Sequence, residues 1–200
     1  MLNRGMLLVV FSTLILCLAG CGGDEEKKAE PAPAAAPAPK PEEKVEIYEL
    51  TKDDVMSHNG WTSKNISVLG VKLSDRTREV EKNLGNVENT RTLPEDYLTV
   101  YQGNGVFVYT FKLTGRARKI EVNQAFAKKI ADAKLQKLLN TGDLKYMREM
   151  FGMEEGDPVQ NSDDNSTEYA YDSRGFRFVK FKVGGKTLNA IRFQEIKKTT

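Results

Sequence analysis

The sequence predicts an α+β fold in which two tandem units, each a short helix plus an antiparallel three-stranded sheet, follow a disordered tether. Three observations favour this fold. Short helical stripes end at glycine, and alternating segments are separated by glycine-containing turns. One pattern of spacings also occurs twice, as Tyr101-x3-Gly105-x5-Phe111-Lys112-x2-Gly115 and as Tyr171-x3-Gly175-x5-Phe181-Lys182-x2-Gly185. A repeated pattern indicates one supersecondary unit used twice.

The chain starts with an apolar run of thirteen residues, 6–18, behind a single charge at Arg4. A membrane-spanning helix needs roughly 20 residues, so this run is typical of a signal peptide. The run ends in Leu18-Ala19-Gly20-Cys21, which resembles the lipobox of bacterial lipoproteins. The resemblance implies that residues 1–20 are cleaved and that Cys21 is diacylated. An uncleaved anchor, or a secretory signal with an incidental cysteine, is the alternative.

A lipidated Cys21 predicts a protein anchored to the cell envelope, because two or more acyl chains hold a protein stably on a membrane. The next residue is Gly22 rather than aspartate, which in the enterobacterial sorting pattern implies the outer membrane, facing the periplasm. Cys17 leaves with the signal peptide, so no disulfide is expected in the folded part. The formal net charge of +2 gives no strong field toward nucleic acid.

Residues 21–44 form the expected lipidated tether. Five of the seven prolines lie there, together with many alanines and no large apolar side chain. Such a segment cannot bury a core, and its Pro/Ala part favours extended, polyproline-like conformers. We interpret it as a spacer, with a contact to a periplasmic ligand or the cell wall as the alternative.

The first α+β unit is expected over residues 45–122. A strand at 45–50 and a strand or extended lead-in at 65–73 precede a helix, whose stripe of Val80 and Leu84 ends at Gly85. Three strands follow, roughly at 97–102, 106–113 and 117–122, and Asn104-Gly105 is a strong hairpin turn. Alternation in the middle strand predicts four side chains that face the helix: Phe107, Tyr109, Phe111 and Leu113.

Residues 123–200 hold the expected linking helix and the second unit. The linking helix covers 123–140, and its lysines form either a solvated face or a surface for an acidic partner or anionic lipid. The helix of the second unit carries Met147 and Phe151 and ends at Gly152. Its strands are expected roughly at 167–171, 176–183 and 188–193. In the second of these, alternation predicts an inward side made of Val179, Phe181 and Val183.

A helix that ends in Val80-x3-Leu84-Gly85, with an echo in Met147-x3-Phe151-Gly152, precedes each expected three-stranded meander. On a small lipoprotein, this layout resembles the SmpA/OmlA (BamE-like) class of outer-membrane lipoproteins. Two such units in tandem are also similar to the fold of β-lactamase-inhibitor-protein-like domains. The resemblance covers about residues 65–195 and implies a protein-binding or envelope-assembly module. It assigns no partner-specific residue.

The sequence contains no recognisable catalytic motif. The single histidine, His58, has no neighbour that would orient it as a general base. No G-x-S-x-G elbow, P-loop or dinucleotide fingerprint occurs. The polar cluster 157–168 lacks the spacing of a calcium loop. We therefore expect no enzyme, no catalytic residue, no cofactor and no metal.

The candidate partner-binding residues lie on the expected outward side of the strand at 176–183: Phe176, Phe178, Lys180 and Lys182. Aromatic side chains beside cations are common in binding hot spots, and a sheet with one covered face offers the other to a partner. The alternative is that the phenylalanines are covered by the linking helix, by the amino-terminal segment, or through a bulge near Val179. The expected function is a protein-binding or envelope-assembly accessory lipoprotein, with a ligand- or cell-wall-binding lipoprotein as the alternative.

Overall fold

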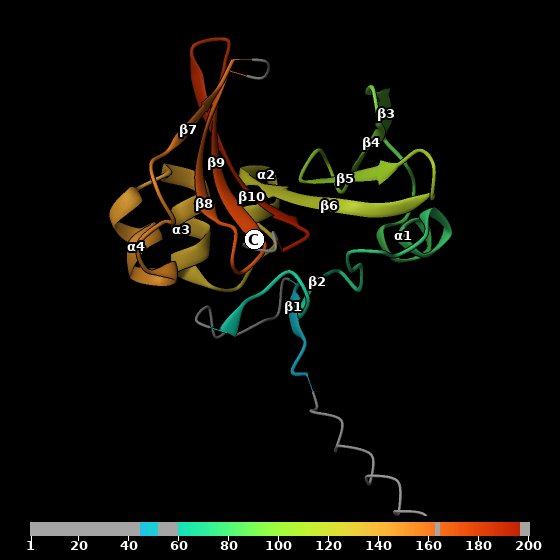
Figure 1. Ribbon diagram of the computed structural model, residues 1–200, viewed down its shortest axis with the longest axis horizontal. Helices are drawn as coiled ribbons and strands as arrows, with labels where there is room; N and C mark the ends of the chain where they lie inside the picture. Colours follow the sequence, from blue (N-terminus) through green and yellow to red (C-terminus); the bar gives the residue numbers. More distant parts are fainter. Residues whose placement is uncertain (1–44, 52–59, 163–164, 197–200) are drawn as a thin grey trace, which may run out of the picture. The chain divides into compact units, whose positions relative to one another are not determined.

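The computed structural model describes residues 45–51, 60–162 and 165–196. They belong to one compact unit, Glu43–Thr200 (Figure 1). The predictions for the signal peptide, the lipid site at Cys21, the tether and His58 lie outside the described residues.

The described residues form ten strands and four helices: β1 (Tyr48–Leu50), β2 (Ile66–Val68), α1 (Thr77–Leu84), β3 (Asn89–Thr92), β4 (Asp96–Tyr101), β5 (Val106–Phe111), β6 (Arg116–Asn123), α2 (Gln124–Ala127), α3 (Ala133–Thr141), α4 (Leu144–Phe151), β7 (Val159–Asn161), β8 (Ser166–Tyr171), β9 (Phe176–Val183) and β10 (Lys186–Gln194). Strands β1 and β2 form a parallel pair. The other eight form one antiparallel sheet in the order β3-β4-β5-β6-β10-β9-β8-β7.

The prediction of two separate units with three-stranded sheets is wrong, because both halves of the chain share one eight-stranded sheet. Strand β6 pairs with β10 and so joins β3–β6 to β7–β10. In two separate sheets, β6 and β10 would each be an apolar edge strand with unpaired backbone N–H and C=O groups. Pairing β6 with β10 gives these groups hydrogen-bond partners. Each half also has a fourth strand, β3 or β7. These two edge strands are polar and mostly exposed, so no apolar alternation marks them in the sequence.

The two halves of the sheet are nevertheless related by their register. Hairpins β4–β5 and β8–β9 pair in equivalent registers along the repeated pattern. At the junction the pairing is reciprocal, since Ile120 faces Phe193 and Val122 faces Ile191. A two-fold relation between equivalent segments produces this kind of exchange. The sequence repeat therefore marks two halves of one sheet.

Helices α2–α4 and the β1–β2 pair lie on one side of the sheet (Figure 1). The side chains buried on that side include Val106 and Val108 of β5 and Phe176 and Phe178 of β9. The predicted inward sides of β5 and β9 are therefore wrong, since Phe107 and its partners in the pattern lie on the opposite face. Alternation separates the two faces of a strand, but it does not say which one is covered when both carry apolar residues.

The predicted linking helix is two helices rather than one. Helix α2 ends at Ala127, and α3 begins after Asp132, whose carboxylate accepts a hydrogen bond from the Leu135 backbone N–H at 2.6 Å. An aspartate in this position satisfies an N–H that has no partner within the helix, so it starts a new helix. The predicted stripe still packs inward, since Ile130 and Leu138 are buried.

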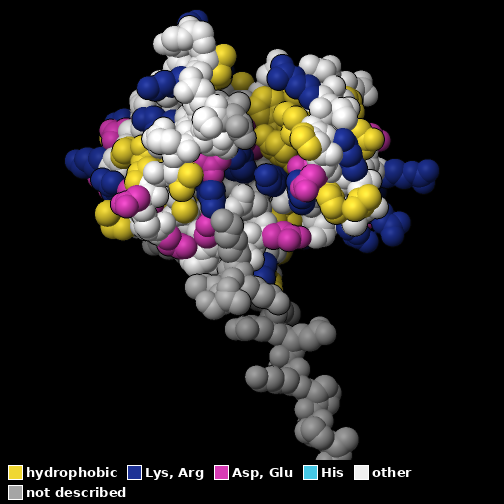
Figure 2. Space-filling model, turned by 45° about the horizontal axis from the view of Figure 1, so that its top comes forward, with side chains coloured by type: hydrophobic (Ala, Val, Ile, Leu, Met, Phe, Trp, Pro, Cys, Tyr) yellow, Lys and Arg dark blue, Asp and Glu magenta, His cyan; other side chains and the backbone are white. Residues whose placement is uncertain are grey.

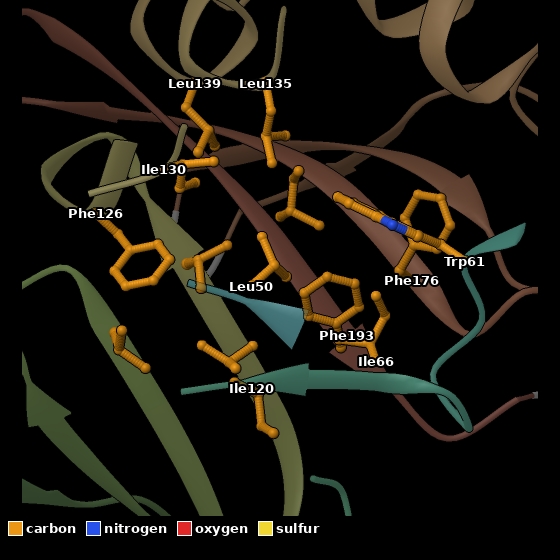
Figure 3. Close-up of a cluster of buried hydrophobic side chains, with 14 of the residues drawn as sticks. Leu50, Trp61, Ile66, Ile120, Phe126, Ile130, Leu135, Leu139, Phe176 and Phe193 are labelled. Atoms are coloured by element: carbon orange, nitrogen blue, oxygen red, sulfur yellow. The ribbon is translucent and has the colours of Figure 1, made fainter. Parts of the chain in front are cut away.

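The core lies between the sheet and its covering layer. Figure 3 shows side chains of α2 and α3 meeting Leu50 and Ile66 of the β1–β2 pair, with Ile120 and Phe193 from the sheet. Trp61, from the segment before β2, is fully buried and joins this cluster. Its ring centroid lies 6.4 Å from that of Phe176 and 6.0 Å from that of Phe193. An amino-terminal segment thus closes a core built largely by the second half of the chain.

Candidate functional site

The face of the sheet opposite the core carries a cleft of about 560 Å³, which we call the apolar groove. Its apolar lining comes from both halves of the sheet: Leu98, Val100, Phe107, Tyr109, Phe181, Val183 and Leu188. These residues alternate with the core residues along strands β4, β5, β9 and β10, so strand periodicity alone brings them to one face. Figure 2 shows hydrophobic side chains gathered beside the hollow between the two lobes of the molecule.

The groove exists because the two halves of the sheet are strongly twisted against each other. In Figure 1, β5 and β6 run across the view while β8–β10 run steeply. The register of β5 and β6 shifts between Tyr109 and Thr110, and such a bulge increases local twist. The apolar side chains of β4 and β5 therefore stand opposite those of β9 and β10 instead of lying in one plane.

The ends of the groove are polar. Asn89 and Arg91 of β3 line it on one side, and Asn123 and Gln124 line it where β6 passes into α2. The side chain of Asn123 also accepts a hydrogen bond from the Ala125 backbone N–H at 2.8 Å, which fixes the start of α2 beside the groove. An apolar floor with polar ends is the usual composition of a binding cleft.

Five charged side chains of alternating sign cross the same face, starting at Glu121 in the groove lining; we call them the ionic row: Glu121, Arg192, Glu168, Arg177 and Asp172. Arg192 Nε lies 2.8 Å from Glu121 Oε2, and Arg192 Nη1 lies 2.6 Å from Glu168 Oε1. Although burial opposes its charge, the Glu121 carboxylate raises the pKa of Arg192. The row fixes the neighbouring strands β6, β10, β9 and β8 to one another on the open face.

A polar cavity of about 460 Å³ adjoins the ionic row. Its lining includes Arg118, Lys119, Arg177 and Arg192. Lys119 Nζ stands 5.5 Å from the centre of the Tyr109 ring, and Tyr109 lines the apolar groove. The polar cavity and the groove therefore meet where Lys119 contacts Tyr109. Burial, together with the nearby charges of Arg192 and Arg118, lowers the pKa of Lys119.

The predicted partner-binding residues do not form an open surface. Phe176 and Phe178 are fully buried under the covering layer, which is the alternative that the sequence left open. Lys180 Nζ donates a hydrogen bond to the Gly142 carbonyl oxygen at 3.2 Å, so it is held at the end of α3. Lys182 is exposed near the tip of the β9–β10 hairpin. A partner therefore cannot reach the two phenylalanines without unfolding the core.

The alternation of apolar residues identified several residues of the apolar groove, but it predicted that they belong to the core. Phe107, Tyr109 and Phe181 are only partly buried, in contrast to the fully buried Val106 and Val108 beside them. The volume of the side chains could have indicated which face is open. Strand β5 has its larger, aromatic side chains on one face and its smaller β-branched side chains on the other. Small side chains allow the covering layer to approach closely, and large ones can form the walls of a cleft.

Two tests on the described residues concern other classes of site. No group of three or more His, Cys, Asp or Glu side chains that could hold a metal ion occurs among them. In the same part of the chain, no helix is both long enough and apolar enough to cross a bilayer.

Comparison with known proteins yields distant structural likeness alone. No protein-family model and no curated protein matches the sequence. The crystal structure of a DUF4309 family protein (YjgB) from Bacillus subtilis is similar at 12% identity, covering 60% of this chain and 78% of that one, with a TM-score of 0.42. A cysteine-rich secretory protein from Staphylococcus aureus shares 5% identity over 75% of this chain and 50% of its own, with a TM-score of 0.34. The resemblance to the SmpA/OmlA class stays a prediction.

Proposed function

We propose that this chain is a lipid-anchored lipoprotein of the cell envelope, facing the periplasm from the outer membrane, that acts by binding a protein partner in the apolar groove. The carrying observation is the groove itself: an accessible face of the sheet whose aromatic side chains, Phe107, Tyr109 and Phe181, stand around a cleft of about 560 Å³. A soluble monomeric domain rarely keeps such a lining without a use for it.

The composition of the face supports a protein partner. Aromatic and arginine side chains are enriched at the centres of protein interfaces, where they supply most of the binding energy. Here the ring of Phe181 lies 5.7 Å from the guanidinium of Arg192, and that of Tyr109 lies 6.0 Å from it. The ionic row keeps these groups in place before any partner arrives, so little ordering is needed on binding.

The test is a crosslinking pull-down from intact envelopes with a Phe107→Ser variant. Phe107 is partly exposed on the open face, so its replacement should leave the melting temperature within a few degrees of the parent. Capture of the envelope partner should be lost. The matched control is Tyr97→Ser, which removes an aromatic side chain that is 44% exposed on the neighbouring strand but does not line the groove. If Phe107→Ser captured the envelope partner as well as Tyr97→Ser does, the groove would not be the binding site.

A small-molecule or cell-wall ligand is the second candidate, and one observation favours it. The groove volume of about 560 Å³ falls within the range of roughly 300–1,000 Å³ typical of small-ligand sites. Native mass spectrometry of the purified protein distinguishes the two candidates. A copurifying small molecule that Phe107→Ser releases favours the second; copurifying protein alone favours the first.

The proposed anchor makes a separate prediction at Cys21. Serine at this position has no thiolate to form the thioether with diacylglycerol, so Cys21→Ser should abolish lipidation and leave the signal peptide uncut. Metabolic labelling with a radioactive fatty acid measures the result directly. Label retained on the Cys21→Ser protein would contradict the lipoprotein assignment, whatever the groove binds.

A further inference from the structure

The rim of the apolar groove carries positive charges that form no ion pair with a carboxylate of the described residues. Arg91 of β3 lines the groove, Lys119 of β6 stands over Tyr109 at its inner end, and Lys186 of β10 lies on the same strand face as Leu188. Among the described residues, none of the three has a carboxylate within ion-pair distance. They come from three different strands: Arg91 is part of the groove lining, Lys119 contacts the lining residue Tyr109, and Lys186 pairs with the lining residue Val183.

The acidic groups nearest the groove are already engaged. Glu121 lines the groove, and its carboxylate contacts Arg192 at 2.8 Å. Glu168 contacts both Arg192 and Arg177, at 2.6 Å and 2.5 Å. Burial, together with the charges of Arg192 and Arg118, lowers the pKa of Lys119, and the weaker effects of Asp96 and Glu168 oppose this shift. A carboxylate entering beside Lys119 would therefore meet a site in which each of the two arginines acts on Lys119 more strongly than either carboxylate, Asp96 or Glu168.

From this charge pattern we propose that the occupant of the apolar groove is an acidic protein segment, in which carboxylate side chains flank a large apolar side chain. The apolar side chain enters between Phe107 and Phe181, and the carboxylates pair with the rim cations Arg91, Lys119 and Lys186. Complementary charge at a rim steers a partner and fixes its register more than it adds affinity. The inference rests on the proposed protein-binding function and specifies the chemistry of the partner.

The spacing of the groove also limits the conformation of this segment. Phe107 lines the apolar groove, and Tyr109, the strand partner of Lys119, lies two residues further along on the same face of β5. At about 3.3 Å per residue, two residues of strand cover roughly 7 Å. An extended segment laid along the strands therefore reaches from the apolar floor to Lys119 with an acidic side chain about two residues from its apolar one.

The test uses two fluorescein-labelled heptapeptides and the purified full-length protein. One peptide has a leucine–phenylalanine–leucine centre with two glutamates on each side, and the other has glutamine in place of every glutamate. The charge variant is Arg91→Gln/Lys119→Gln/Lys186→Gln, which leaves the apolar floor unchanged. The groove variant is Phe107→Ser. Fluorescence anisotropy measures the dissociation constants, at about 50 mM and about 500 mM salt.

The acidic peptide should bind the parent protein, and the charge variant should weaken this binding about tenfold, in line with the modest strength of exposed ion pairs. High salt should remove most of the difference between the parent and the charge variant. The glutamine peptide should bind more weakly and equally to both. The groove variant should lose both peptides.

Three results would overturn the inference. The charge variant could bind the acidic peptide as tightly as the parent does. Sodium dodecanoate, added as a fatty-acid competitor, could displace the acidic peptide and bind more tightly than the peptide does. The groove would then be a lipid site. Finally, the acidic peptide could fail to bind while Phe107→Ser still loses the envelope partner, which would leave the proposed function standing and remove only its acidic specificity.

Discussion

Replacement of Phe176 by alanine should lower the free energy of unfolding by about 3–5 kcal/mol, the range for a fully buried aromatic side chain. The Phe176 ring stacks on Tyr171 at 4.9 Å between centroids and meets Phe151 at 5.0 Å and Trp61 at 6.4 Å. These contacts join β9, β8, α4 and the amino-terminal segment. A cavity there would remove contacts from all four.

The matched control is Phe181→Ala, on the same strand and of the same chemistry. Phe181 lies on the open face and is only partly buried, so its loss should cost less than half as much. Urea denaturation followed by circular dichroism gives both values. Equal losses for the two variants would mean that the groove face is packed as tightly as the core, and the proposed binding site would then be untenable.

This pair of variants also shows where sequence-based prediction ends for this chain. The approximate bounds of six strands and the helix at Leu144–Phe151 were predictable, because turn glycines and alternating apolar residues mark them. The covered face of β9 was not predictable. One side of this strand carries Phe176 and Phe178 and the other carries Val179, Phe181 and Val183, and only the packing of the helices decides between them.

Two further features depend on contacts that no local pattern encodes. The pairing of β6 with β10 joins segments about seventy residues apart, and each of these strands alternates in a way that also suits a separate three-stranded sheet. Trp61 comes from a segment with little periodicity of its own, yet it closes the core against Phe193. Since the groove needs both halves of the sheet, a prediction that separated the halves could not contain it.

Replacement of Arg192 by methionine should have an effect as large as that of the core cavity. The Arg192 side chain is 9% exposed and lies between the carboxylates of Glu121 and Glu168, which are 2% and 8% exposed. Methionine fills a similar volume but removes the positive charge, so the two carboxylates lose a buried counter-charge. Breaking a buried pair on one side typically costs about 3–5 kcal/mol.

A double-mutant cycle isolates the charge from the packing. Arg192→Met combined with Glu121→Gln removes the guanidinium and also the β6 carboxylate that it contacts. The double variant should therefore recover most of the free energy of unfolding that Arg192→Met alone loses. Lys145→Met serves as the control, since its side chain is 81% exposed and reaches Glu149 only at 4.0 Å; it should leave the denaturation midpoint nearly unchanged. If the double variant were as unstable as Arg192→Met alone, the loss would come from packing. The ionic row would then be a consequence of the fold, and the sheet face beside the groove would be held by its apolar contacts.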